Sequence, residues 1–66
     1  MQLHELKWEP FPQHNIWVEV ASISLIGNRV WRNAAGRYYF EYMPYGWPDG
    51  FDALEAQCIL YEVLRR

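Results

Sequence analysis

Cysteine, positive charge and long apolar runs are all scarce in this sequence. Cys58 is the only cysteine, which excludes a disulfide within the chain and fits a reducing compartment. No apolar run approaches the roughly 20 residues of a membrane-spanning helix, and the opening MQLHELKWEP lacks the apolar stretch of a signal peptide. Eight acidic residues against six basic ones give a net charge of −2, so no general attraction to nucleic acid or anionic lipid is expected. We therefore expect a cytoplasmic protein with no membrane partner.

Patterns for metal binding and catalysis are also missing. The soft ligands His4, His14 and Cys58 do not have the close pairwise spacing of a zinc site. The candidate nucleophiles are Cys58, Ser22 and Ser24, but both histidines lie in the segment with the least predicted structure. We therefore predict no metal, no cofactor and no enzymatic activity.

Aromatic residues are abundant for a chain of this length. Three Phe, four Trp and five Tyr occur among 66 residues. A chain this short buries only about 60% of the surface that its unfolded form exposes. Since one helix covers only one face of a sheet, we expect some of the rings to face outward.

The stretch RVWRNAAGRYYFEY predicts a β-hairpin. Aromatic and β-branched residues lie in two arms, 29–32 and 37–43, and a short loop that ends in Gly36 joins them. The residues expected on the core face of the second arm are Tyr38, Phe40 and Tyr42.

Alternating apolar and polar residues over 16–22 predict a strand before the hairpin. Glu19 marks the wetter face, which places Trp17 outside. The expected inward residues are Ile16, Val18 and Val20. A bulge near residues 22–24 would exchange the two faces, so the register stays open here.

The C-terminal residues 52–66 predict a helix. Asp52 is a good N-cap, and Glu55 completes a capping box three residues later. The apolar stripe at helical spacing is Ala53, Ala56, Ile59, Leu60, Val63 and Leu64. A flank that the core leaves uncovered is expected to carry Leu54, Cys58 and Tyr61.

These elements predict one α+β domain spanning residues 1–66. It consists of an extended segment 1–15, a three-stranded antiparallel meander 16–43, an aromatic loop 44–51 and the helix 52–66 packed on one face. Within the first segment, Leu6–Glu9 fits a short edge strand that Pro10 would end. In the loop, WPDG fits a type I turn that begins at Trp47. The free sheet face is expected to carry Trp17, Trp31 and Tyr39.

Protein binding is the function that the surplus of rings favours, because Trp, Tyr and Arg are enriched at interface hot spots. The predicted contact residues are Trp17, Arg29, Trp31, Arg32, Arg37, Tyr39, Tyr45 and Trp47. The same surface would serve a homodimer. One alternative is a nucleic-acid interface on the basic hairpin Arg29–Arg37, although these arginines could instead pair with Glu19 and Glu41 and cover rings. Another is a structural role in a larger assembly.

Several segments together resemble small proteins encoded by tailed phages and prophages. The segments are LKWE at 6–9, Trp17, VWR at 30–32 after Gly27, GRYYF at 36–40 and FDALEA at 51–56. The resemblance implies a β-meander followed by a helix, and a phage or mobile-element origin. It also implies a host-takeover or counter-defence factor, similar to anti-CRISPR proteins, that blocks a host protein in the bacterial cytoplasm.

Overall fold

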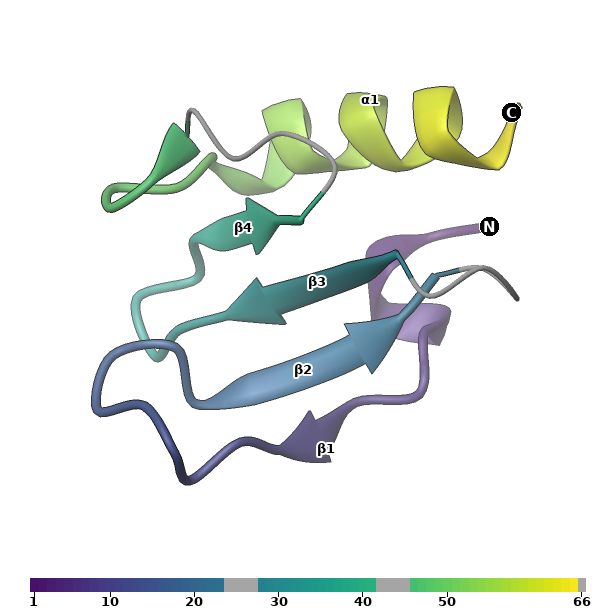
Figure 1. The fold of residues 1–66 in the computed structure, drawn as a ribbon. Helices are drawn as coiled ribbons and strands as arrows, with labels where there is room; N and C mark the ends of the chain where they lie inside the picture. Colours follow the sequence, from purple (N-terminus) through teal and green to yellow (C-terminus); the bar gives the residue numbers. More distant parts are fainter. Residues whose placement is uncertain (24–27, 42–45, 66) are drawn as a thin grey trace.

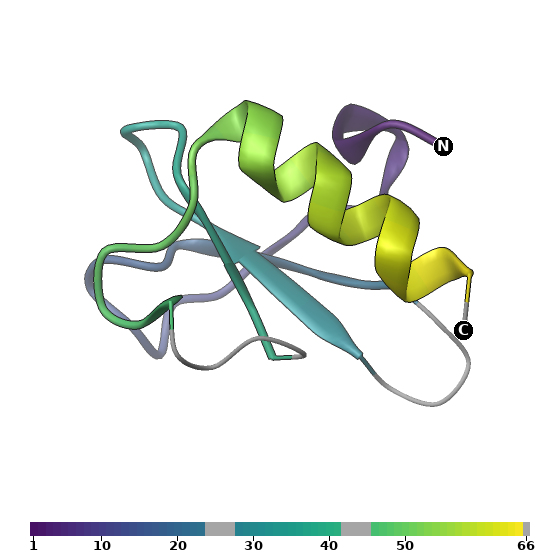
Figure 2. The same ribbon diagram turned by 90° about the horizontal axis from the view of Figure 1, so that it is seen from above.

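The protein folds as two layers, an antiparallel sheet and a C-terminal helix that covers one of its faces (Figures 1 and 2). The computed structural model describes residues 1–23, 28–41 and 46–65. Its elements are the 3₁₀ helix η1 (Leu3–Glu5), the strands β1 (Glu9–Pro10), β2 (Glu19–Ser22), β3 (Arg29–Arg32) and β4 (Tyr38–Phe40), and the helix α1 (Ala53–Leu64). The predicted α+β class with a C-terminal helix is confirmed.

The predicted number of strands is wrong, because the described residues form four strands in the order β1-β2-β3-β4. The additional strand is β1, in which Glu9 pairs with Val20 and Pro10 with Glu19. The edge strand expected at Leu6–Glu9 forms later, at Glu9–Pro10, and Pro10 is its last residue. Since β1 is at the sheet edge, the missing N–H of Pro10 removes no ladder hydrogen bond.

The β3–β4 hairpin is confirmed, and its loop is held by a side chain. Asn33 Oδ1 accepts hydrogen bonds from the backbone N–H groups of Ala35 (3.0 Å) and Arg37 (2.9 Å). Gly36 supplies the positive φ of +79° that the loop requires. The strand β4 ends at Phe40, and the predicted core residue Tyr42 lies outside the described residues.

The faces predicted for the first strand are wrong. The strand β2 begins at Glu19, and Ala21 pairs with Val30, which in turn pairs with Phe40 under the helix. Val20 therefore faces away from α1, beside Trp31. The other residues expected inside, Ile16 and Val18, are 51% and 39% exposed. The predicted bulge near residues 22–24 falls partly outside the described residues.

The core lies between the sheet and α1. Its buried members are Leu3, Leu6, Ala21, Val30, Phe40, Ala56, Ile59, Leu60 and Val63. Trp8 packs against this core, and its indole N–H donates to the Leu3 carbonyl (3.0 Å). The N-terminal segment is therefore part of the folded domain, since Leu3 N–H also donates to Gln57 Oε1 of α1 (2.9 Å).

The helix begins at the predicted capping box. Asp52 Oδ1 accepts from the Glu55 N–H (2.9 Å), and Glu55 Oε1 accepts from the Asp52 N–H (3.5 Å). Ala53 and Leu64 were predicted in the buried stripe but are exposed, because they lie at the two ends of the helix. Within the described residues, no helix is both long and apolar enough to cross a membrane.

Candidate functional site

Aromatic rings gather on the sheet face opposite α1. Val20, Trp31 and Tyr39 share one row of the sheet and face away from the helix. The segment 11–18, between β1 and β2, and the segment 46–50, before α1, fold over this row. We call the resulting group the outer aromatic cluster: Phe11, His14, Trp17, Trp31, Tyr39 and Trp47.

Hydrogen bonds hold the segment 11–18 in place. At its ends, Phe11 N–H donates to the Val18 carbonyl (2.8 Å), and Val18 N–H donates to the Arg32 carbonyl (3.1 Å). Between them, His14 Nδ1 accepts from the backbone N–H groups of Ile16 (3.0 Å) and Trp17 (3.1 Å). An imidazole nitrogen accepts hydrogen bonds only when it carries no proton. The acceptor Nδ1 of His14 therefore positions the backbone of Trp17.

The segment 46–50 is attached to the hairpin by Arg37. Its Nε donates to the Asp49 carbonyl (2.8 Å), and its Nη2 donates to the Gly50 carbonyl (2.9 Å). Gly50 N–H donates to the Gly46 carbonyl (2.7 Å). The hydrogen bond that closes this loop therefore begins one residue before Trp47, where the predicted type I turn would begin. Arg37, a predicted partner contact, thus also attaches this loop to the hairpin within the chain.

Gly50 lies where the loop meets the cluster. Its φ is +76°, and a Cβ at this position would lie 2.6 Å from Trp17 Cη2 and 2.6 Å from the Tyr38 carbonyl oxygen. The next residue, Phe51, exchanges backbone hydrogen bonds with Tyr38 (2.7 and 2.8 Å). The loop therefore rests on β4 and on the Trp17 ring, which requires a residue without a side chain.

Tyr39 is the centre of the ring contacts. Its ring centroid lies 6.0 Å from that of Trp17, 5.6 Å from that of Trp31 and 5.2 Å from that of Trp47. His14 meets Trp47 edge to face at 5.5 Å, and Phe11 meets Trp31 in the same way at 6.0 Å. Such pairs contribute about 0.5–1.5 kcal/mol each beyond the area that they bury. The cluster is thus a second small core.

This second core is incompletely covered. Trp17 is only 2% exposed, whereas Trp47 is 48% exposed and lies beside it at 6.1 Å. The six described cluster side chains line a hollow of about 140 Å³. Trp47 and the hollow form the accessible part of the cluster, while Trp17 is the buried ring beside them.

Two indole N–H groups of the cluster have no hydrogen-bond acceptor among the described residues. They are Trp17 Nε1 and Trp31 Nε1, and both atoms are buried. A buried donor that lacks an acceptor costs about 1–3 kcal/mol. Within the described residues, the hydrogen-bonding capacity of the cluster is therefore not fully satisfied.

The hairpin arginines are engaged within the chain. Arg29 pairs with Glu41 (2.8 Å) and lies over Trp31 at 5.1 Å, on the rim of the cluster. Arg32 binds Glu19 through two hydrogen bonds (2.7 and 3.2 Å). The hydrogen bond from Arg32 lowers the pKa of Glu19, and the same bond raises the pKa of Arg32.

Arg32 also lies 4.2 Å from the ring of Trp8, which packs on the helix side of the sheet. It is therefore separated from the outer aromatic cluster. Among the predicted contact residues, the structure brings together Trp17, Arg29, Trp31, Tyr39 and Trp47. Tyr45 lies outside the described residues. Phe11 and His14 were not predicted, because a lone ring in a proline-rich loop and a lone histidine carry no specific signal.

Comparison with known proteins finds no relative: no family model, no curated protein and no solved structure matches this chain. The resemblance to phage proteins therefore stays a prediction.

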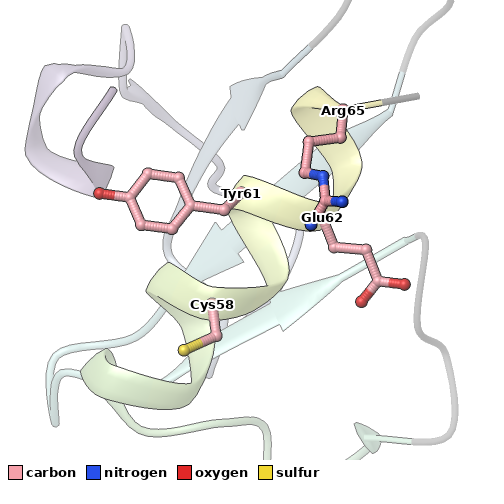
Figure 3. Close-up of a pocket in the computed structure, with 4 residues that line it drawn as sticks. All are labelled: Cys58, Tyr61, Glu62 and Arg65. Atoms are coloured by element: carbon pink, nitrogen blue, oxygen red, sulfur yellow. The ribbon is translucent and has the colours of Figure 1, made fainter.

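A second surface lies on α1. Cys58, Tyr61, Glu62 and Arg65 line a hollow of about 430 Å³, but their side chains diverge, with Tyr61 pointing toward the N-terminal segment and Glu62 away from it (Figure 3). Tyr61 accepts a hydrogen bond from Gln2 Nε2 (3.3 Å). Among the described residues, no group of three His, Cys, Asp or Glu is placed to hold a metal ion. The four side chains that line this hollow do not point toward one another, so we assign no shared binding or catalytic site to them.

Proposed function

We propose that this chain is a non-enzymatic protein-binding module that docks a partner on the outer aromatic cluster. The observation that carries the proposal is Trp47, which is 48% exposed on a loop fixed by hydrogen bonds. Tryptophan is one of the residues enriched among interface hot spots. Since the ring is already held in place, binding costs little conformational entropy at this position.

The surroundings of Trp47 support the same proposal. Ile16 and Val18 are exposed on the neighbouring segment. The Arg29–Glu41 ion pair lies two positions along the hairpin from Trp31 and Tyr39, and the Arg29 guanidinium lies over the Trp31 ring. An apolar centre with a charged pair at its rim is the usual anatomy of a protein interface.

The nucleic-acid alternative has less support. Arg29 and Arg32 are paired with carboxylates, and Arg37 is bonded to two backbone carbonyls. Phosphate affinity depends mainly on free positive charge, and the net charge of the chain is −2. A host protein in the bacterial cytoplasm is the partner that the resemblance to phage factors favours. A second copy of the chain and a larger assembly are the other candidates.

Affinity capture with three baits tests the proposed surface. The baits are the wild-type chain, Trp47→Ser and Leu54→Ser, incubated with an extract of the cells that produce the protein. Leu54 is the matched control, because it is 78% exposed on α1, which packs on the opposite face of the sheet. We expect one partner to be retained by the wild type and Leu54→Ser and lost by Trp47→Ser.

Calorimetry with the purified partner then measures the loss. We expect Trp47→Ser to weaken binding at least about thirtyfold, which corresponds to the roughly 2 kcal/mol of a hot spot. A partner that binds Trp47→Ser with wild-type affinity would contradict the proposal, and one that only Leu54→Ser loses would move the interface to the helix.

A further inference from the structure

One histidine contacts both the buried and the exposed tryptophan of the outer aromatic cluster. His14 Nδ1 accepts hydrogen bonds from the backbone N–H groups of Ile16 (3.0 Å) and Trp17 (3.1 Å). The same imidazole ring meets Trp47 edge to face, with the two centroids 5.5 Å apart. His14 therefore links the backbone that carries the enclosed Trp17 to the ring that remains accessible to a partner.

Protonation removes the acceptor on which this arrangement depends. Both nitrogens of an imidazolium carry a proton and only donate, so rotation of the ring supplies no second acceptor. The N–H groups of Ile16 and Trp17 would then point at a third N–H instead of a lone pair. The middle of the segment 11–18 is thus held by hydrogen bonds that acid breaks.

The two ends of the segment are held by bonds that do not titrate. Phe11 N–H donates to the Val18 carbonyl, and Val18 N–H donates to the Arg32 carbonyl. Because backbone amides keep their protons, these attachments persist when His14 becomes charged. The effect of acid therefore falls on the residues between the two ends, which include Trp17.

His14 is the only residue of the segment 11–18 with a titratable side chain. The charged and titratable residues on the elements packed around it are Tyr39 on β4, Asp49 beside Trp47, Arg37, which binds the Asp49 carbonyl, and the pair Arg29–Glu41 at the rim of the cluster. Histidine is the side chain that ordinarily changes its charge between about pH 5 and pH 8. The response of this group to mild acid is therefore set by His14.

We propose that His14 makes the outer aromatic cluster sensitive to pH. The cluster is fixed while Nδ1 accepts the two backbone hydrogen bonds, and it loosens when Nδ1 is protonated. Tyr39 and Trp47 both pack on Trp17, so they lose a fixed neighbour when the backbone of Trp17 is released. Docking on Trp47 then weakens in mild acid, a step that rests on the proposed protein-binding function.

A charged His14 also gains one favourable contact, which opposes this effect. An imidazolium beside the indole of Trp47 is attracted to the ring. Since Trp47 is 48% exposed, this attraction is worth less than the two hydrogen bonds that are lost. The unfolded chain has no such bonds to lose, so acidification favours it, and the free energy of unfolding should rise with pH through the histidine range.

NMR titration of the ¹⁵N-labelled free chain from about pH 8 to about pH 5, the range of histidine, tests the proposal. The readouts are the ring nitrogens of His14, the backbone amides of Ile16 and Trp17, and the indole N–H groups of Trp17 and Trp47. We expect Nδ1 to be the unprotonated ring nitrogen of His14 at the upper pH. The amide and indole resonances should shift together with the titration of this ring.

Urea unfolding at the two ends of the same range compares three chains: the wild type, His14→Asn and His4→Asn. Asparagine offers an acceptor oxygen at position 14 but does not titrate. His4 is the matched control, because it is exposed on η1 and outside the cluster. On acidification the folding equilibrium constant of the wild type and of His4→Asn should fall roughly five- to thirtyfold more than that of His14→Asn.

Three results would overturn the proposal. These are a proton on Nδ1 of His14 at the upper pH, Trp17 and Trp47 resonances that do not follow the titration of His14, and wild-type pH dependence in His14→Asn. If His14→Asn does not fold, the titration of the wild type decides alone. A cluster that loosens in acid, together with a captured partner that does not require Trp47, would support the pH response and contradict the docking surface, and the opposite pair of results would do the reverse.

Discussion

Replacing Gly50 by alanine should loosen the outer aromatic cluster, because the added Cβ would meet both a ring of the cluster and the backbone of β4. The new Cβ would lie 2.6 Å from Trp17 Cη2 and 2.6 Å from the Tyr38 carbonyl oxygen, and the φ of +76° would be strained for alanine. Left-handed backbone costs roughly 1–2 kcal/mol for an L-residue. Overpacking against a buried ring adds about 1–3 kcal/mol.

Gly36 provides a matched control for the backbone term. Its φ is +79°, but a Cβ there would have no atom within 4 Å among the described residues. Gly36→Ala should therefore lose only the roughly 1–2 kcal/mol of left-handed strain. The difference between the two variants isolates the contact of the loop with Trp17 and Tyr38, and we expect it to be about 1–3 kcal/mol.

Urea unfolding followed by tryptophan fluorescence and by circular dichroism measures both variants. A domain of this size has a free energy of unfolding of roughly 3–10 kcal/mol, so the expected loss is a large share of the total. In thermal melts, each kcal/mol corresponds to about 4–8 °C. Equal losses for Gly50→Ala and Gly36→Ala would refute the packing of residues 46–50 on Trp17, and with it the second core.

Two further predictions concern groups that hold the sheet and its loops. His14→Asn should preserve most of the stability, because an amide oxygen replaces Nδ1 as the acceptor for the N–H groups of Ile16 and Trp17. His14→Ala should lose about 1 kcal/mol more of the free energy of unfolding, measured in urea. Equal losses for the two variants would show that this acceptor contributes nothing to stability. The pKa of Glu19 is lowered by its hydrogen bond with Arg32, so the ion pair stabilises the fold above the unfolded-state pKa, and this contribution is lost as the pH falls through the lower folded-state pKa. The free energy of unfolding measured between about pH 3 and pH 6 should therefore fall less steeply with acidification in Glu19→Gln than in the wild type, and the interpretation fails if the two slopes coincide.

The parts of the fold that depend on residues close together in the sequence were predictable. The Asp52–Glu55 capping box and the Asn33–Gly36 loop each join residues no more than four positions apart. Their hydrogen bonds follow from residue type and spacing alone. The helix and the hairpin were therefore correct, apart from their ends.

The faces of the first strand were not predictable in this way. The residues before β2 alternate as a strand would, but His14 Nδ1 accepts hydrogen bonds from the N–H groups of Ile16 and Trp17, and the backbone bends at residues 15–16. A charged residue such as Glu19 indicates a solvent face, but here Arg32 pairs with Glu19 on the helix side of the sheet. Both errors come from hydrogen-bond and ion-pair contacts that a periodic sequence pattern does not reveal.

The candidate site was partly predictable, because its location depends on segments distant in the chain. Trp31 and Tyr39 follow from the hairpin register, since they pair directly across β3 and β4. The enclosure of Trp17 depends on Gly50, 33 positions later in the chain. No pattern in the sequence joins these two residues before the chain is folded.

The rings of the outer aromatic cluster contribute differently to stability and to binding. Trp17 is enclosed and touches Tyr39, Trp47 and the position of Gly50, so its ring belongs to the second core. Trp47 keeps nearly half of its surface in water, so its removal leaves much less buried area uncovered. A partner that covers Trp47 therefore gains apolar area that folding has left exposed. This is the physical reason to expect that the surplus of rings, which one helix cannot cover, serves recognition rather than folding alone.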